Sequence, residues 1–300
     1  GNDTLESVVE GTKGLNVISP TWYRLNDSQG GFTSAATQKY VDRAHDMGLE
    51  VWALVENIEY KESIDMYAIL SSTTNRARLI DGLIAEALTY GFDGINVDFE
   101  QISDDCGEHF TEFIRELSIP CRKNGLVLSI DNYVPMGGSG HYNRTEQGNV
   151  ADYVVIMGYD EHYAGSKEAG SVASIDFVEK GIEQTVAQVP AQKVINAVPF
   201  YTRIWQTGDG QISSQAVGME KAEEFISNHS IQTEWDEATC QNYGEYTSGG
   251  ELYQVWLEDE RSLEVKFNIM DKYQLAGVAF WRLGFEKPQV WDVVETYLNR

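Results

Sequence analysis

The stretch FDGINVDFEQI, residues 92–102, decides how the chain is read. Its alternation predicts a β-strand, because successive side chains of a strand point to opposite faces. The strand then has an apolar face and a polar face: Ile95, Val97 and Phe99 on one, and Asn96, Asp98 and Glu100 on the other. Two explanations are open at this point. The strand lies at the edge of a sheet with one face in water, or its polar face serves a site.

Composition limits the classes of partner. The chain has 300 residues, 42% of them hydrophobic, which is enough for one large domain or two small ones. A net charge of −25 makes nucleic acid and anionic membranes poor partners, whereas a neutral sugar is compatible. The 3 cysteines and 5 scattered histidines show neither a disulfide framework nor zinc-ligand spacing. No run of 18 apolar residues predicts a membrane span, so we expect no direct membrane contact.

The start of the chain carries no visible signal peptide and no initiating methionine, because it begins with Gly1. We expect a processed or trimmed fragment from which an export signal or anchor has been removed.

Apolar segments typical of strands alternate with amphipathic segments typical of helices. The predicted strands are residues 15–20, 50–55, 92–102, 126–130, 153–157, 193–198 and 277–281. The predicted helices are residues 34–48, 75–90, 105–123, part of 172–189, and 288–298. This order predicts parallel strands joined by right-handed crossovers, in an open doubly wound sheet or a closed barrel. The first strand lacks the glycine-rich turn that a doubly wound sheet would need, which favours the barrel.

We therefore predict a single α/β domain over residues 1–300, a (β/α)8 TIM barrel. Only seven strands are visible and the chain opens on a helical segment, so we expect the first strand to be missing from this fragment. A small α+β insertion, about residues 206–275, follows the seventh barrel strand. It is predicted to contain a helix, three short strands and a second helix, and to lie on the C-terminal rim.

The barrel prediction changes the reading of the polar face. Both faces of a barrel strand are covered, so an edge strand in water no longer fits. The face that carries Asn96, Asp98 and Glu100 then points into the barrel at the C-terminal end of its strand, where barrel enzymes place their active sites. Carboxylates in close file repel, so one of them is expected to hold a proton near neutral pH and to act as a general acid.

Residues 93–100, DGINVDFE, resemble the D-G-x-D-x-D-x-E signature of glycoside hydrolase family 18, the family of chitinases and related N-acetylglucosaminidases. Residues 157–160, MGYD, resemble its M-x-Y-D motif. Residues 199–205 and Trp281 resemble the ends of its seventh and eighth strands. The chain looks most similar to the bacterial branch that includes spore-germination, cortex-lytic enzymes. One departure is Asn96, where the family has an aspartate. An amide cannot share a proton as a third carboxylate could, but it fits this branch, and we expect at most a shifted pH optimum.

The resemblance implies substrate-assisted cleavage without a metal or cofactor. Glu100 would protonate the glycosidic oxygen, and the 2-acetamido carbonyl of the substrate would be the nucleophile. Asp98 would orient the acetamide, and Tyr159 would donate a hydrogen bond to its oxygen. The remaining expected substrate contacts are Asn96, Asp160, Tyr201, Arg203, Trp281, Asn132, Tyr133 and Trp22.

The predicted function is therefore a retaining hydrolase of β-1,4-linked N-acetylglucosamine in bacterial peptidoglycan or spore cortex. Two alternatives stay open: a chitinase acting on chitin oligomers, and a sugar-binding module without catalysis. The expected partner is a glycan that contains N-acetylglucosamine, with no nucleic acid. We expect a monomer that works outside the cell or in the cell envelope.

Overall fold

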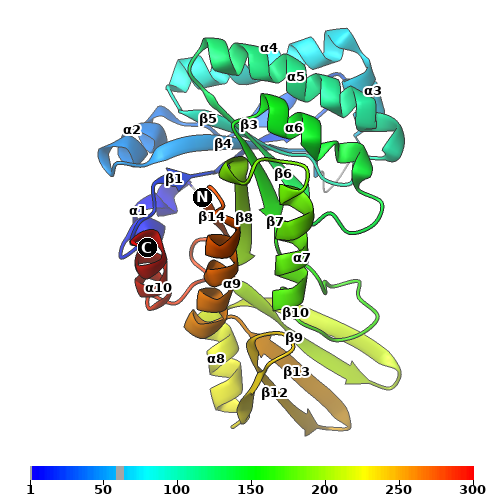
Figure 1. The fold of residues 1–300 in the computed structure, drawn as a ribbon, viewed down its shortest axis with the longest axis vertical. Helices are drawn as coiled ribbons and strands as arrows, with labels where there is room; N and C mark the ends of the chain where they lie inside the picture. Colours follow the sequence, from blue (N-terminus) through cyan, green and yellow to red (C-terminus); the bar gives the residue numbers. More distant parts are fainter. Residues whose placement is uncertain (1, 59–63) are drawn as a thin grey trace. The chain divides into compact units, whose positions relative to one another are not determined.

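The computed structural model describes residues 2–58 and 64–300 (Figure 1). The chain forms two compact units. Unit 1 comprises residues 1–5, 15–156 and 185–194, and unit 2 comprises residues 6–14, 157–184 and 195–300. Each unit contains parallel strands with helices, as predicted for an α/β chain. Among the residues that the structure describes, no helix is both long enough and apolar enough to cross a bilayer.

Unit 1 is built on a mostly parallel sheet. Its strand order is β3 (Phe32–Ser34), β2 (Thr21–Leu25), β4 (Glu50–Glu56), β5 (Gly94–Asp98), β6 (Val127–Tyr133) and β7 (Tyr153–Met157). Strands β2, β4, β5 and β6 run parallel, and β3 is antiparallel to β2. The short strand β1 (Val17–Ile18) pairs with β4. The predicted strand over residues 15–20 is thus reduced to the two residues of β1, and the longer strand β2 directly follows the predicted range.

Helices cover this sheet. They are α2 (Gln38–Asp46), α3 (Met66–Ser71), α4 (Thr73–Tyr90), α5 (Gly107–Lys123) and α6 (Arg144–Val150). The two longest, α4 and α5, lie side by side (Figure 1). Helix α4 ends where predicted, because Gly91 adopts a left-handed φ of 70° and donates its N–H to Ala87. Phe99, which follows β5, stacks on Phe113 of α5 with ring centroids 5.5 Å apart. The apolar face of the quoted stretch is therefore core, as expected.

Unit 2 holds a parallel strand pair, β8 (Val194–Pro199) and β14 (Gly277–Trp281). Its helices are α1 (Leu5–Val9), α7 (Ile175–Val186), α8 (Met219–Asn228), α9 (Glu260–Tyr273) and α10 (Val290–Leu298). Phe200 and Phe280 stack at 4.5 Å between ring centroids, and Trp291 of α10 packs edge-on against both rings. This aromatic group fixes the ends of β8 and β14.

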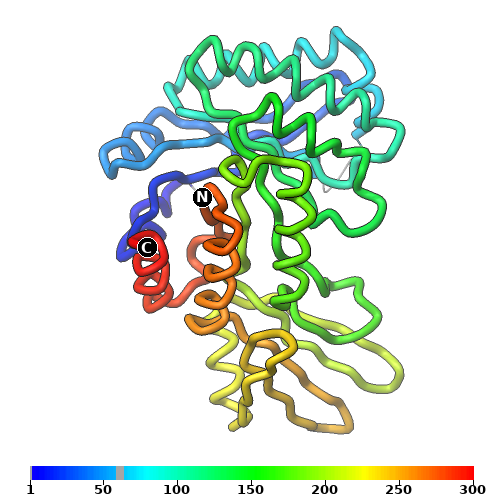
Figure 2. Tube along the Cα trace, in the orientation of Figure 1, coloured from blue at the N-terminus to red at the C-terminus, as the bar shows by residue number. Residues whose placement is uncertain are grey.

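A five-stranded antiparallel sheet forms the insertion in unit 2. Its order is β10 (Gln211–Gly218), β9 (Tyr201–Gly208), β13 (Glu251–Leu257), β12 (Gln241–Ser248) and β11 (Thr233–Asp236). Figure 2 shows its two long hairpins, β9–β10 and β12–β13. The three strands predicted in the insertion correspond to β11, β12 and β13, and the hairpin β9–β10 was missed because its strands are rich in polar residues. The antiparallel sheet therefore begins at Tyr201.

The strand that carries the acids is shorter than predicted. Strand β5 ends at Asp98, so Glu100 lies in the segment that follows. The next residue, Gln101, has a φ of 54°, in the left-handed region where the chain turns away. Glu100 is thus positioned by side chains rather than by a strand ladder.

Candidate active site

Two neighbouring strands of unit 1 carry polar side chains on one face. In the register of β5 and β6, Asn96 pairs with Ser129. The side-chain amide of Asn96 donates hydrogen bonds to Ser129 Oγ at 2.9 Å and to Asp131 Oδ1 at 2.8 Å. The register pair Val97 and Ile130 precedes Asp98 and Asp131 by one position, so these two carboxyl groups are neighbours across the strands. The polar row predicted on one strand is therefore a polar patch on two.

Electrostatics in this patch favour protonated carboxyl groups. Burial raises the pKa of Asp98 to about 9, and the nearby charges of Asp131, Glu100 and Glu56 add to the effect. Burial also raises the pKa of Asp131 to about 7, against the lowering effect of the Asn96 hydrogen bond. Asp98 consequently keeps its proton at neutral pH. That one acid of the row holds a proton near neutral pH stays a prediction, and the raised pKa of Asp98 favours this residue as the holder.

One oxygen of Asp98 is open to a ligand. Its Oδ1 is buried and accepts no hydrogen bond within residues 2–58 and 64–300. A buried carboxyl oxygen without a partner is costly, because it has lost its water and gained nothing in return. An amide N–H of a bound molecule would satisfy it.

Glu100 is held at its backbone and at its side chain. The Asn57 side chain donates to the Glu100 carbonyl oxygen at 2.7 Å and accepts from the Glu100 N–H at 2.8 Å. The Tyr133 hydroxyl donates to Glu100 Oε2 at 2.8 Å. Tyr133, expected as a sugar contact, is thus a direct partner of Glu100. Burial raises the pKa of the Tyr133 phenol, so the hydroxyl stays a donor.

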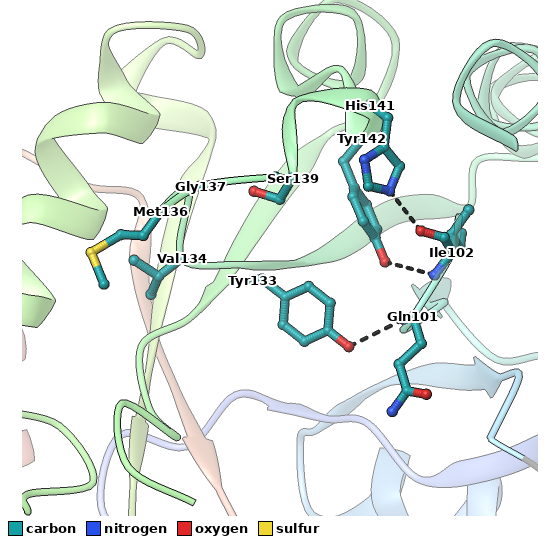
Figure 3. Close-up of a pocket in the computed structure, with 10 residues that line it drawn as sticks. Gln101, Ile102, Tyr133, Val134, Met136, Gly137, Ser139, His141 and Tyr142 are labelled. Atoms are coloured by element: carbon teal, nitrogen blue, oxygen red, sulfur yellow. Dashed lines mark hydrogen bonds between the residues drawn. The ribbon is translucent and has the colours of Figure 1, made fainter. Parts of the chain in front are cut away.

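Unit 1 has a pocket of about 270 Å³ whose lining includes Gln101, the residue after Glu100, and Tyr133, the hydrogen-bond partner of Glu100 (Figure 3). Its wall begins at Tyr133 and Gln101, whose backbone N–H donates to the Tyr133 hydroxyl at 3.2 Å. Tyr142 closes another side: its hydroxyl donates to the Phe99 carbonyl at 2.9 Å and accepts from the Ile102 N–H. The pocket is therefore lined by residues that follow β5 and by the end of β6 with the segment after it, and these include two tyrosines and His141.

Unit 2 gathers a second set of predicted site residues. The Tyr201 hydroxyl donates to Asp160 Oδ1 at 2.5 Å. Tyr159 meets the Tyr201 ring edge-on, with centroids 6.2 Å apart. Burial, with the nearby Asp160 charge, raises the pKa of Tyr201, so its phenol is neutral and donates. Arg203, two residues on in β9, donates to Ser214 Oγ at 2.8 Å. The MGYD motif and the start of β9 thus meet in one cluster.

Two glycines of the resembling motifs are required by close packing. A Cβ on Gly94 would lie 2.9 Å from the carbonyl oxygen of Val127, and one on Gly158 would lie 2.7 Å from that of Ala197. Neither distance is tolerable for a real methyl group. The small residue lets each strand approach its neighbour, which sets the position of the polar residues that follow.

Three other expected contacts fare differently. Trp281 ends β14 with 42% of its surface exposed, so its ring is available to a ligand. Trp22 is only 3% exposed and packs edge-on against Tyr40 of α2. Asn132 is 1% exposed and exchanges hydrogen bonds with Gln147 of α6. Trp22 and Asn132 lie in the core, which argues against their expected sugar contacts, because core packing and a closed amide pair satisfy them.

Asp131 and Asn57 were not expected in the site. Asp131 could have been found, because Ser129, Asp131 and Tyr133 alternate along β6 as the acids do along β5. Asn57 follows β4 in a segment without such a pattern. Asp93 ties the loop before β5 to β4 by accepting the Val51 N–H at 2.8 Å, which is a structural role. In the part of the chain that the structure describes, no group of three or more metal-ligating side chains is placed to hold an ion.

The motifs and their geometry agree with a family comparison: the model of glycosyl hydrolases family 18 matches residues 30–286. The chain belongs to glycosyl hydrolases family 18. The predicted family is confirmed, and with it the enzyme class of a glycosidase domain.

Two curated relatives of this family 18 domain come from Bacillus subtilis. The chain is 32% identical over 228 residues to the sporulation-specific glycosylase YdhD of Bacillus subtilis, across 73% of this chain and 53% of the relative. It is 26% identical over 258 residues to the cortical fragment-lytic enzyme of the same organism, across 82% of this chain and 59% of the relative. The chain thus spans between half and two thirds of the length of these curated relatives.

A solved chitinase from Chromobacterium violaceum has the same fold, with a TM-score of 0.86 and 24% identity over 95% of this chain and 92% of that one. This likeness confirms the predicted fold class, an α/β barrel fold of the chitinase type with an added antiparallel sheet.

Proposed function

We propose that this domain is a retaining glycosidase that cleaves β-1,4-linked N-acetylglucosamine in bacterial peptidoglycan or spore cortex. The observation that carries the proposal is the pair Asp98 and Glu100. Glu100 is held at backbone and side chain beside a pocket, and Asp98 offers a buried oxygen with no partner among the described residues. An acid next to an amide-binding carboxyl is what substrate-assisted cleavage requires.

The proposed reaction has two steps. Glu100 gives its proton to the glycosidic oxygen while the acetamide carbonyl oxygen of the sugar attacks the anomeric carbon, which closes an oxazolinium ring. Asp98 Oδ1 accepts the acetamide N–H. When Asp98 releases its own proton, its carboxylate stabilises the positive charge that develops on nitrogen. Glu100 then takes a proton from water, which opens the ring on the face that the leaving group left. The anomeric configuration is retained.

The residues of unit 2 are assigned by their motifs. Tyr159 is proposed to donate to the acetamide oxygen, and Trp281 to stack on the sugar ring. Asp160, Tyr201 and Arg203 are proposed to contact sugar hydroxyls. The mutual hydrogen bond of Tyr201 and Asp160 supports these assignments, because it fixes the direction of both side chains.

The setting is proposed from the relatives. Bacillus subtilis proteins named for sporulation and for lysis of cortical fragments support a cell-envelope substrate and a place outside the cytoplasm. A net charge of −25 is compatible with an uncharged glycan portion and disfavours nucleic acid. We propose a monomer and a single catalytic domain with its insertion.

Glycan cleavage tests the proposal. The chain and its Glu100→Gln variant are incubated with peptidoglycan, spore cortex fragments and chitin oligomers, and new reducing ends are identified by mass spectrometry. New N-acetylglucosamine ends from the wild type alone establish the hydrolase and rank the substrates. Preference for chitin oligomers supports the chitinase alternative. Sugar binding without any cleavage overturns the enzyme in favour of a binding module.

A further inference from the structure

The departure of this chain from the family motif has a counterpart on the next strand. The motif has an aspartate where this chain has Asn96, and an amide cannot take up a proton. Strand β6 supplies a carboxyl instead: Asp131 accepts a hydrogen bond from Asn96 at 2.8 Å and lies one register position beyond Ile130, beside Asp98. The site therefore still has three carboxyl groups, although one stands on a different strand.

We propose that Asp131 is a positioning residue of the glycosidase that accepts the proton Asp98 must release when the acetamide nitrogen becomes positive. The inference rests on the proposed function. The step is balanced: the Asp98 carboxyl becomes a carboxylate, and the Asp131 carboxylate becomes a carboxyl. No other reactant is needed, and the charge of the pair stays at −1.

The surroundings favour a shared proton over two free charges. The two carboxyl groups are neighbours in a site where burial penalises charge, so losing both protons is unfavourable. In the resting protein the buried pair therefore shares one proton. A cation forming against Asp98 Oδ1 moves this proton to Asp131, because the cation stabilises the Asp98 carboxylate directly and the Asp131 carboxylate only from a distance.

Asn96 determines where the accepting carboxylate stands. Its amide group bonds Ser129 and Asp131 at once, so both of its N–H donors are directed at β6. A planar amide with two fixed partners has little freedom to rotate. Asn96 is thus explained as the residue that holds the carboxylate of Asp131 in place, and not as the loss of a carboxylate from the site.

Other ionisable groups act on the pair. Glu56 of β4 pairs in register with Asp98 and is bound by Arg24. Glu100 follows β5 and raises the pKa of both aspartates by its charge. Tyr133 donates a hydrogen bond to Glu100, and the charges of Glu100 and Asp98 contribute to the raised pKa of the Tyr142 phenol. The Asp131→Asn variant leaves all of these groups in place.

The test compares the wild type with Asp131→Asn and with a double variant, Asn96→Asp with Asp131→Asn. The single variant keeps the size of the side chain and the oxygen that accepts from Asn96, so the fold is preserved. The double variant returns the carboxylate to β5. The readouts are kcat, KM and the pH profile of kcat on a β-1,4-linked N-acetylglucosamine tetramer and on cortex fragments.

We expect Asp131→Asn to lower kcat by about tenfold or more, with KM changed less than about threefold and the pH profile displaced. The double variant should recover a large part of the lost kcat. An unchanged kcat and pH profile in Asp131→Asn overturns the inference. A loss that the double variant does not recover also overturns it, because Asp131 would then be merely structural.

A second readout separates this inference from the proposed function. Carbon-13 NMR of labelled aspartate carboxyl groups should show two coupled titrations in the wild type and the loss of one in Asp131→Asn. If the wild type cleaves no glycan, the proposed function fails and the NMR titration alone decides whether the pair shares a proton. Two aspartates that titrate independently near their ordinary pKa rule the pair out.

Discussion

The phenol oxygen of Tyr133 lies 2.8 Å from Oε2 of Glu100 and donates a hydrogen bond to it. Tyr133 is the last residue of β6, and Glu100 lies two residues past the end of β5. The bond therefore ties the proposed acid to a strand next to its own. A donor fixed on a strand holds a side chain more precisely than one on a loop.

Tyr133→Phe removes only this hydroxyl. We expect kcat on N-acetylglucosamine oligomers to fall by about tenfold with little change in KM, because the lost hydrogen bond would stabilise the Glu100 carboxylate that forms when the proton is transferred, and a hydrogen bond to a charged group contributes about 1.5–3 kcal/mol. Steady-state kinetics measure the effect. Tyr67→Phe, at a tyrosine of α3 that is 46% exposed, is the matched control and should leave kcat unchanged. Equal kinetics of wild type and Tyr133→Phe would show that the bond does not serve catalysis.

The acid cluster makes stability depend on pH. Asp131, with a pKa of about 7, and Asp98, with a pKa of about 9, keep protons in the folded protein that the unfolded chain loses near pH 4. The unfolded chain then binds fewer protons, so the free energy of unfolding falls as the pH rises from about 4 to about 7 for Asp131, and on to about 9 for Asp98.

Urea denaturation between pH 5 and pH 9 measures this dependence. We expect the wild type to lose more than about 1 kcal/mol of unfolding free energy from pH 5 to pH 8, and Asp131→Asn to lose less. The difference between the two curves isolates Asp131 from the many other acids of the chain. Parallel curves for the two proteins would contradict the raised pKa of Asp131.

Gly158 has room for no side chain. An added methyl group would lie 2.7 Å from the Ala197 carbonyl oxygen, and Tyr159 and Asp160 follow directly. We expect Gly158→Ala to lower kcat/KM by about tenfold and the unfolding free energy by about 1–3 kcal/mol, since the backbone must shift. Gly277→Ala is the matched control in unit 2, where nothing lies within 4 Å of the added methyl group. Normal kinetics of Gly158→Ala would mean that the Tyr159 segment tolerates the shift.

Unit 2 contains a buried ion pair between Lys266 of α9 and Glu258, which lies just before that helix. Lys266 Nζ lies 2.8 Å from Glu258 Oε1, and both side chains are 1% exposed. Lys266→Met leaves a buried carboxylate without its cation, so we expect a loss of about 3–5 kcal/mol in unfolding free energy. Lys272→Met, on the same helix but with the lysine 60% exposed, should cost less than about 1 kcal/mol.

Denaturation of both lysine variants at one pH gives the comparison. The double variant Lys266→Met with Glu258→Gln should regain part of the loss, because the uncompensated charge is gone. Equal destabilisation by Lys266→Met and Lys272→Met would show that burial of the pair has no energetic weight.

The sequence predicted the elements of the fold that have a regular apolar pattern or a clear turn residue at their ends. Strands β7 and β14 have the predicted bounds, because each is a regular apolar pattern between turn signals. The hairpin β9–β10 escaped prediction, since its strands mix serine, threonine and glutamine with few apolar residues. A periodic pattern of apolar residues indicates which face of a strand is buried. A strand that is held mainly by pairing with its neighbour has no such pattern in its own sequence.

The site was predictable in its acids and less so in what supports them. Asp98 and Glu100 could be predicted as site residues, because burying a row of carboxylates costs free energy unless the row serves a site. Asn57 did not, because its role depends on the pairing of β4 with β5, which the sequence alone does not give. The burial of Trp22 was not predicted, because an aromatic residue after a predicted strand has the same sequence pattern whether its ring faces solvent or packs on α2.

The side-chain amide of Asn57 bonds both the N–H and the C=O of Glu100. It replaces the backbone hydrogen bonds that a neighbouring strand would make, because β5 has already ended at Asp98. No other side chain of this length offers a donor and an acceptor that both persist at every pH, since an aspartate has no donor once ionised. The position of Glu100, the proposed acid, is therefore set by a neutral side chain, whose hydrogen bonds do not change when the surrounding carboxyl groups gain or lose charge. Its protonation is set by those carboxyl groups, so separate parts of the molecule determine its location and its charge.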